Sequence, residues 1–223
     1  MKAMLLAAGR GERLRPLTDQ TPKPLLTVGG KPLIVWHLEA LARAGVRAVV
    51  INLSWLGGQL RAALGSGERH GVHIQYSEEP GGPLEVGGGI FQALPLLGAA
   101  PFLVVNADTF TRFEFVRLAI APDSLAHLVL VPNPAHHPHG DFSLREGAIT
   151  EAGEPRLTYA GIGLYRPELF ARCTAGRFPL LPQLRAAIGA GRLSGERFDG
   201  LWVDVGTAER LAALNAMPHD GAR

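Results

Sequence analysis

The first residues whose types and spacing suggest chemistry form the stretch LAAGRGERLRPLTDQTPKPL, which begins at Leu6. Gly9 and Gly11 let a ligand approach the backbone closely, and consecutive N–H groups in such a loop can hold an anion. Guanidinium and ammonium groups add side-chain donors for phosphate. The stretch carries four of them, on Arg10, Arg13, Arg15 and Lys23. We therefore expect a phosphate-binding loop here.

Two common phosphate motifs do not fit this loop. The string G-x-x-x-x-G-K-[ST] does not occur, and the third glycine of G-x-G-x-x-G is replaced by Leu14. A solvated basic loop would explain the glycines and arginines alone. It does not explain Lys23, because Pro22 and Pro24 fix the path that returns this lysine toward the glycines. The sequence favours a phosphate site of another kind.

Two aspartates are candidates for holding a cation. Asp108 follows the apolar run PFLVVN, and Asp204 lies within LWVDV, where an unpaired charge is costly. Each could instead cap a helix or a turn. Mg²⁺ suits one or two carboxylates because it keeps waters and takes phosphate oxygens. We expect Asp108 and Asp204 to hold Mg²⁺.

Three further features are less specific. Gly87 to Gly89 precede a helical pattern, where small residues let a nucleobase or sugar lie against the backbone, although a plain loop-to-helix transition explains them equally well. His136, His137 and His139 lie in a proline-rich segment without metal-ligand spacing, so we expect a solvated loop rather than a zinc site. Cys173 is the single cysteine, which excludes an internal disulfide, and we expect it to be an ordinary small residue.

Strand-like and helix-like patterns alternate along the chain. Residues 3–8, 46–53, 72–78 and 101–108 are predicted as strands, and residues 34–45, 57–65 and 88–98 as helices. Beyond Ala121 we expect strands at 124–133 and 157–165, a hairpin at 141–150 that turns near Glu146, a helix within 178–191, a strand at 197–206 and a last helix at 208–217. This pattern predicts an α/β fold with a mostly parallel, mixed sheet covered by helices on both faces. We expect one domain, residues 1–223.

Composition excludes several classes of protein. The chain of 223 residues has 47% hydrophobic residues and a net charge of +2, so it can bury one sizeable core and does not require nucleic acid or a membrane as partner. No apolar run is long enough to span a bilayer, and the N-terminal run is too short for a secretion signal. We expect a soluble cytoplasmic protein. Its oligomeric state is left open.

The opening stretch closely resembles the signature of the sugar-phosphate nucleotidyltransferases, L-A-A-G-x-G-x-R-(L/M)-x-P-L-T followed by P-K-P-L. The resemblance continues through PLEVGGGIFQAL, VVNAD, YAGIGLY and WVDVGTAERL, and so spans nearly the whole chain. It implies a Rossmann-like α/β fold and transfer of a nucleotidyl group from a nucleoside triphosphate to a sugar 1-phosphate, with release of pyrophosphate. No general base is needed, because the attacking phosphate is already anionic.

The resemblance also assigns roles to residues. Arg13 would contact the β- and γ-phosphates, Lys23 would approach the α-phosphate and the sugar phosphate, and both would be catalytic. The nucleotide would be bound by Leu6, Ala7, Ala8, Gly9, Gly11, Gly87, Gly88 and Asn106. The sugar phosphate would be bound by Lys23, Gly140, Asp141 and Gly161, and Mg²⁺ by Asp108 and Asp204.

The sequence departs from the family pattern at several points. Ala107 replaces the usual glycine before the metal aspartate, EAGEPRL lacks the usual Glu-Lys-Pro, and the base-reading residue is obscured in EEPGGPLE. The short chain and the segments PLEVGGGIFQALPLLG and HGDF resemble most the members that join UTP to N-acetylmuramate α-1-phosphate in cell-wall recycling. Mannose-1-phosphate guanylyltransferases come second. A non-catalytic nucleotide-sugar sensor is the alternative of another class, but it would be expected to lose Lys23 or an aspartate.

A substrate with a lactyl carboxylate should meet a basic group beyond the sugar phosphate. Arg145 and Arg156 are the candidates, although either could simply be a solvated residue of the hairpin region.

Overall fold

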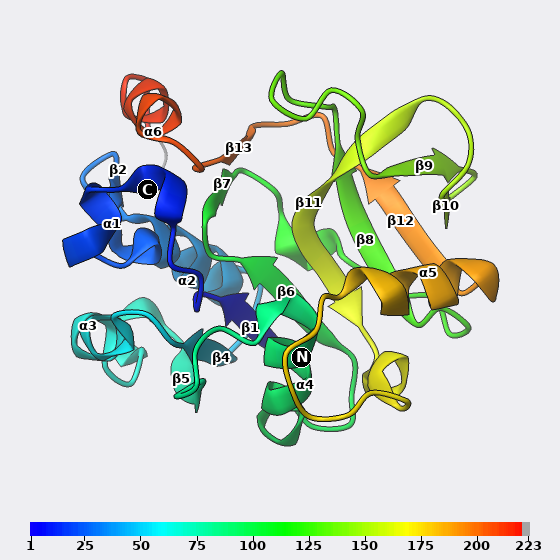
Figure 1. Ribbon diagram of the computed structural model, residues 1–223, viewed down its shortest axis with the longest axis horizontal. Coiled ribbons are helices and arrows are strands. Elements are labelled where there is room, and N and C mark those ends of the chain that lie inside the picture. Colours follow the sequence, from blue (N-terminus) through cyan, green and yellow to red (C-terminus); the bar gives the residue numbers. More distant parts are fainter. Residues whose placement is uncertain (220–223) are drawn as a thin grey trace.

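The computed structural model describes residues 1–219, and a nine-stranded sheet runs through it in the order β5-β4-β1-β6-β11-β8-β12-β10-β9 (Figure 1). Its strands, in chain order, are β1 (Lys2–Leu6), β4 (Ala48–Leu53), β5 (His73–Glu78), β6 (Phe102–Asn106), β8 (Ala126–Val131), β9 (Phe142–Arg145), β10 (Ala148–Thr150), β11 (Arg156–Tyr165) and β12 (Leu193–Arg197). Two small ribbons flank the sheet, β2 (Thr27–Val28) with β3 (Lys31–Pro32), and β7 (Thr109–Thr111) with β13 (Trp202–Asp204).

The sheet is mixed, and its two halves differ. β5, β4, β1 and β6 are parallel to one another, which places the loops that follow them at one edge. β11 then enters antiparallel to both β6 and β8, and the hairpin β9–β10 adds further antiparallel pairs. In the second half β12 pairs parallel with β8, so the antiparallel pairs come from β11 and from the hairpin. The predicted mixed sheet is therefore present, with its continuous parallel part confined to the first half.

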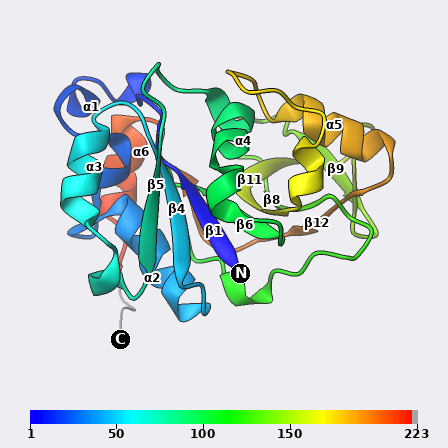
Figure 2. The same cartoon turned by 90° about the horizontal axis from the view of Figure 1, so that it is seen from below.

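Helices cover both faces of the sheet, and the strand residues alternate between two cores. Ala3 and Leu5 of β1 face the core under α2 (Leu33–Arg43) and α3 (Gly57–Leu64), whereas Met4 faces the core under α4 (Glu85–Leu97) and α5 (Leu181–Gly189). Figure 2 shows α2 and α4 on opposite sides of β1 and β4. The shorter helices are α1 (Leu17–Gln20) and α6 (Ala208–Asn215).

Five 3-10 turns complete the described chain, at Glu12–Leu14, Lys23–Leu25, Glu68–His70, Phe115–Arg117 and Pro167–Phe170. Within residues 1–219, no helix combines the length and the apolar character that a membrane crossing requires.

Most predicted elements are present, and the hairpin is confirmed with its turn at Glu146 and Gly147, whose φ angles are 49° and 80°. The single strand predicted at 197–206 is wrong. Its residues contribute the last position of β12 and then β13, which pairs with β7 in a separate ribbon. The chain is interrupted at Phe198, whose ring packs against Phe113 and lies over Gly200.

Candidate active site

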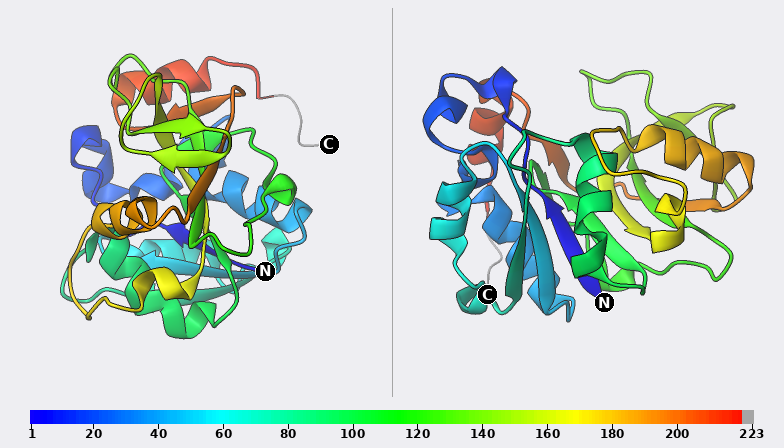
Figure 3. Two further views of the ribbon diagram at one scale, coloured as in Figure 1. Left: turned by 90° about the vertical axis from the view of Figure 1, so that its right-hand side faces the viewer. Right: turned by 60° about the horizontal axis from the view of Figure 1, so that its bottom comes forward.

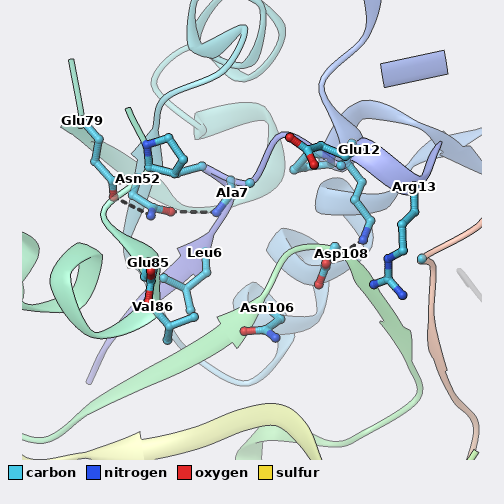
Figure 4. Close-up of a pocket in the computed structure, with 17 residues that line it drawn as sticks. Leu6, Ala7, Glu12, Arg13, Asn52, Glu79, Glu85, Val86, Asn106 and Asp108 are labelled. Carbon is cyan, nitrogen blue, oxygen red and sulfur yellow. Dashed lines mark hydrogen bonds and ion pairs between the residues drawn. The ribbon is translucent and has the colours of Figure 1, made fainter. Parts of the chain in front are cut away.

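A cavity of about 440 Å³ opens where β1 and β6 end, at the edge where ligands bind in open parallel sheets. Figure 4 shows its walls, which come from the glycine loop, the strand ends and the start of α4. Nine of the predicted site residues line it: Leu6, Ala7, Ala8, Gly9, Gly11, Arg13, Lys23, Asn106 and Asp108. It is also lined by Glu12, Pro24, Asn52, Glu79, Pro83, Glu85, Val86 and Gly206.

Gly11 allows the glycine loop to fold onto Lys23. Its φ is 67°, and a Cβ there would lie 3.0 Å from Thr18 Cγ2 and 3.2 Å from Lys23 Cβ. The Thr18 hydroxyl donates to the Gly11 carbonyl at 2.8 Å and fastens the loop. A larger residue would therefore strain the backbone and push the loop away from the lysine.

Lys23 and Asp108 form an ion pair beside the glycine loop, and both line the cavity. Lys23 Nζ donates to Asp108 Oδ2 at 2.6 Å, and the two side chains are 8% and 39% exposed. The ammonium is thus held in place by buried packing, whereas the carboxylate still faces solvent. Figure 4 shows the Arg13 guanidinium directed toward the same space. Two cations therefore lie beside an accessible carboxylate at this wall of the cavity.

Asp204 reaches the neighbourhood of Asp108 through the β7–β13 ribbon. Asp204 pairs in register with Thr109, and the Val205 N–H donates to the Asp108 carbonyl at 3.1 Å. Asp204 itself does not line the cavity, although Gly206 does. Its Oδ2 accepts from Arg210 Nη1 at 2.7 Å, so a cation already faces it.

The two aspartates fit Mg²⁺ better than a metal that needs a complete protein cage. Within residues 1–219, no cluster of three His, Cys, Asp or Glu side chains could enclose an ion. Two carboxylates on neighbouring backbones leave the remaining positions to waters and phosphate oxygens, which is the coordination that Mg²⁺ prefers.

A buried bridge between three loops was missed in the sequence. Asn52, at the end of β4, accepts from the Ala7 N–H at 2.7 Å and donates to Glu79 Oε1 at 2.8 Å. The other Glu79 oxygen accepts from the Leu84 N–H at 2.8 Å. Both side chains are 3% exposed. The amide in the apolar run VVINL was the available signal, since a buried polar side chain needs a partner.

His37 binds the backbone of the residue that follows Asp108. Its Nε2 lies 2.6 Å from the Thr109 carbonyl, which can only accept, so the nitrogen carries a proton and donates. Burial lowers the pKa of His37 to about 4, against the hydrogen bond to Thr109 and the charge of Asp108. A neutral imidazole therefore fixes β7 immediately after Asp108.

Gly87 and Gly88 lie outside the cavity lining. A Cβ on Gly87 would lie 2.6 Å from the Phe178 ring, and one on Gly88 would lie 2.3 Å from the Gly176 carbonyl oxygen. The Gly88 N–H also donates to the Phe178 carbonyl at 3.0 Å. These glycines let α4 pack against residues 176–179.

Of the predicted sugar-phosphate residues, Lys23 lines the cavity, whereas Gly140, Asp141 and Gly161 belong to the second half of the sheet and its loops and do not line it. Gly161 lies against Asn106, since a Cβ there would be 2.5 Å from the Asn106 amide nitrogen. A Cβ on Gly140 would lie 2.6 Å from Asn133 Oδ1, and Asp141 accepts from the Tyr159 N–H at 2.8 Å. Only Gly161 among these three thus touches a cavity residue through these contacts.

The histidine loop is largely exposed, as expected, and two of its histidines lie close to carboxylates. His136 Nε2 lies 3.3 Å from Asp204 Oδ2, and His137 Nε2 lies 3.1 Å from Asp141 Oδ1. Arg156 donates from Nη1 to the Glu151 carbonyl and from Nη2 to the Asp141 carbonyl, whereas its buried Nε has no hydrogen-bond partner among residues 1–219.

The fold and the site define the class of protein. An α/β sheet whose strand ends carry a glycine-rich basic loop and a lysine–carboxylate pair is a scaffold for chemistry on phosphates. The nucleotidyl transferase family model matches residues 2–144, and the chain belongs to that family. It is a nucleotidyltransferase.

Individual relatives extend this similarity over the whole chain. The N-acetylmuramate alpha-1-phosphate uridylyltransferase of Neisseria meningitidis serogroup B is 53% identical and covers 97% of this chain and 98% of its own. The enzyme of the same name from Caulobacter vibrioides is 34% identical over 96% and 95%. A mannose-1-phosphate guanyltransferase of Aspergillus fumigatus is 31% identical over 92% of this chain but only 61% of its own length.

A solved structure shares the fold. A putative glucose-1-phosphate thymidylyltransferase from Bacillus anthracis, solved in complex with a sucrose, superimposes with a TM-score of 0.82 over 97% of this chain and 94% of its own, at 24% identity.

Proposed function

We propose that this enzyme joins UTP and N-acetylmuramate α-1-phosphate to give UDP-N-acetylmuramate and pyrophosphate. An oxygen of the sugar phosphate forms a bond to the α-phosphorus of UTP, and the bond from that phosphorus to the bridging oxygen of the β-phosphate breaks. The observation that carries the proposal is the glycine loop with its Lys23–Asp108 pair, in a chain 53% identical along nearly its whole length to a uridylyltransferase of that name.

The basic residues of the cavity would do the work of charge compensation. Two anions must meet at the α-phosphorus, so their negative charge has to be screened and the reacting atoms held in line. The proposal gives Lys23 the α-phosphate and the sugar phosphate, and Arg13 the β- and γ-phosphates. The backbone of Leu6, Ala7, Ala8, Gly9 and Gly11, with Asn106, would hold the nucleotide. The N–H of Ala7 is already bonded to Asn52, so the N–H groups beyond it must serve the phosphates.

Asp108 and Asp204 would hold Mg²⁺. Bound there, the ion would supply positive charge to the phosphate oxygens. The exposed carboxylate of Asp108 and the neighbouring backbone of Asp204 support this assignment. Lys23 would then leave Asp108 for the phosphates.

The remaining assignments rest on fewer contacts. Gly161 in the sugar site is supported by its contact with Asn106, whereas Gly140 and Asp141 rest on the family resemblance alone. Gly87 and Gly88 would act on the nucleotide only through the position of α4. We also propose that the enzyme works in the cytoplasm as one domain, with the nucleoside triphosphate and the sugar 1-phosphate as its partners, and that it supplies peptidoglycan recycling.

The test is a panel of UTP, dTTP and GTP against the 1-phosphates of N-acetylmuramate, N-acetylglucosamine and mannose, with pyrophosphate release as the readout. The highest kcat/KM should belong to UTP with N-acetylmuramate α-1-phosphate, and excess chelator should abolish that rate. A preference for GTP with mannose 1-phosphate would overturn the proposed substrate assignment. Full activity in excess chelator would exclude a requirement for a divalent metal ion.

A further inference from the structure

Arg210, on α6, has more hydrogen-bonding capacity than its contacts use. Its Nη1 donates to Asp204 Oδ2 at 2.7 Å and lies 2.7 Å from His136 Nε2. A guanidinium has five N–H donors. Among residues 1–219, neither Nε nor Nη2 of Arg210 has a hydrogen-bond acceptor. The side chain is 20% exposed, so it is not fully enclosed by protein.

Arg210 lies at the edge of the active-site cavity. A Cβ on Gly206, which lines the cavity, would be 2.3 Å from Arg210 Nη2 and 3.1 Å from Asp204 Oδ2. The absence of a side chain at Gly206 therefore lets the guanidinium rest against the cavity wall. Figure 3 shows α6, in red, at the same end of the molecule as the loop between β8 and β9, which carries His136.

The other cations near the cavity are committed elsewhere. Lys23 and Arg13 face the position proposed for the phosphates. Arg177 pairs with Glu85 at 2.9 Å at the start of α4. The two arginines suggested by the sequence do not line the cavity. Arg156 donates to backbone carbonyls, and Arg145 is exposed at the end of β9, beside Gly153.

We propose that Arg210, positioned by Asp204 and His136, binds the carboxylate of an acidic sugar 1-phosphate and selects it over the same sugar without the carboxylate. The planar fork of arginine matches a carboxylate through two parallel hydrogen bonds, and the unused Nε and Nη2 donors form one such edge. The inference rests on the proposed function, since N-acetylmuramate differs from N-acetylglucosamine by a lactyl group that carries this charge.

His136 gives the site a second element. The loop that carries it joins β8 to β9, 74 residues before Arg210 in the chain, and its imidazole meets the guanidinium on the side of Asp204. Removing the imidazole should loosen Arg210 without removing its charge. A smaller effect in the same direction is therefore expected.

The experiment compares kcat/KM for N-acetylmuramate α-1-phosphate and N-acetylglucosamine α-1-phosphate, both with UTP. Arg210→Gln should lower the value for the carboxylated sugar about 10- to 100-fold, the usual effect of losing a charge-assisted hydrogen bond, and change the other value much less. Arg210→Lys should restore part of the preference, and His136→Ala should lose part of it. Arg185→Gln, which removes an exposed arginine paired with Glu151, is the matched control.

A second readout does not depend on turnover. Calorimetric titration with each sugar 1-phosphate, without UTP, should show that Arg210→Gln weakens binding of the carboxylated sugar selectively. Equal losses for both sugars would overturn the inference, because Arg210 would then act only through Asp204. Failure of the proposed function would appear instead in the unaltered enzyme, as a lack of turnover with N-acetylmuramate α-1-phosphate.

Discussion

At the scale of single residues, the ion pair between Lys23 and Asp108 concentrates the chemistry of the site. The Lys23 side chain is 8% exposed and its ammonium lies 2.6 Å from the carboxylate, so only the end of the side chain has to move from Asp108 to a phosphate. Lys23→Ala should lower kcat by about 100- to 1,000-fold, the range found when one preorganised donor to a developing charge is removed. Steady-state pyrophosphate release measures this.

The matched control is Lys31→Ala, which removes another paired lysine, bound to Glu39 at 2.6 Å and remote from the cavity. It should leave kcat near that of the unaltered enzyme. The fold should survive Lys23→Ala, because Asp108 is 39% exposed and stays hydrated without its partner. A change in thermal stability alone, with normal turnover, would make Lys23 a structural residue.

His37 makes a prediction about pH. Its pKa is lowered to about 4 by burial, against an ordinary value of 6.5, so the folded state binds its proton less readily than the unfolded state. The stability that His37 contributes is therefore present above pH 6.5 and is lost as the pH falls toward 4. The expected loss is about 2–3 kcal/mol of unfolding free energy between pH 7 and 4.5.

The variant that isolates this effect is His37→Gln, whose amide can still donate to the Thr109 carbonyl but cannot titrate. Urea unfolding at pH 7 and pH 4.5 should give a smaller acid-induced loss for it than for the unaltered protein. His73→Gln, at an exposed position, controls for the loss of a histidine as such. An identical acid-induced loss in His37→Gln and the unaltered protein would exclude His37 as the source.

The residue types in the sequence predicted one part of the site but not the hydrogen-bonded contacts between its loops. The glycine loop, Lys23 and Asp108 are close in the structure because a continuous signature and one strand end encode them. The contact of Asn52 with Glu79 depends instead on which strands are neighbours, namely β4 beside both β1 and β5. The Asn52 amide within the apolar run VVINL indicates a buried polar group, but nothing in the local sequence identifies Glu79 as its partner. The strand order that joins them is a property of the whole sheet.

At the scale of elements, the glycines at the start of α4 have two proposed roles, helix packing and nucleotide binding. The two roles predict different effects of a substitution. A Cβ on Gly88 would lie 2.3 Å from the Gly176 carbonyl oxygen, so Gly88→Ala must displace backbone and should cost about 1–3 kcal/mol of stability. If Gly88 served only to admit the nucleotide, the same change would raise the KM for UTP and leave stability unchanged. Urea unfolding and steady-state kinetics together separate the two.

Gly58, in α3, is the matched glycine. A Cβ there would meet nothing within 4 Å, so Gly58→Ala should stabilise the protein by about 0.5–1 kcal/mol through helix propensity. Equal stability of the two alanine variants would contradict the packing of α4 against residues 176–179.

One strand could not have been found from local pattern. β12 has the sequence LSGER, whose polar residues and central glycine are poor strand formers. It forms because it pairs with β8 over five positions, and Gly195 is required because a Cβ would lie 2.8 Å from the Leu128 carbonyl oxygen. Pairing with β8 therefore overrides the low strand propensity of this segment. The apolar runs of β1, β4 and β6, in contrast, predict buried strands from local sequence alone.

At the scale of the whole molecule, the core extends across the two halves of the sheet, whereas the cavity lies at the end of the parallel half. β11 joins the parallel half to the rest by pairing with β6, and one core contains Met4 and Phe102 together with Leu128 and Leu184. No smaller unit keeps its core when the other half unfolds. The chain should therefore unfold in a single transition, with calorimetric and van't Hoff enthalpies that agree.

Bound product should stabilise the folded state and so raise the temperature of that single transition. UDP-N-acetylmuramate with Mg²⁺ at about 100 times its Kd adds about 2.7 kcal/mol, which corresponds to a rise in Tm of about 5–10 °C for a chain of this size. GDP-mannose at the same concentration should raise the Tm less, because the proposed base and carboxylate contacts are lost. Scanning calorimetry decides both points. Two transitions, of which only one responds to the product, would mean that the cavity belongs to a separately folding part and that the single-domain arrangement is wrong.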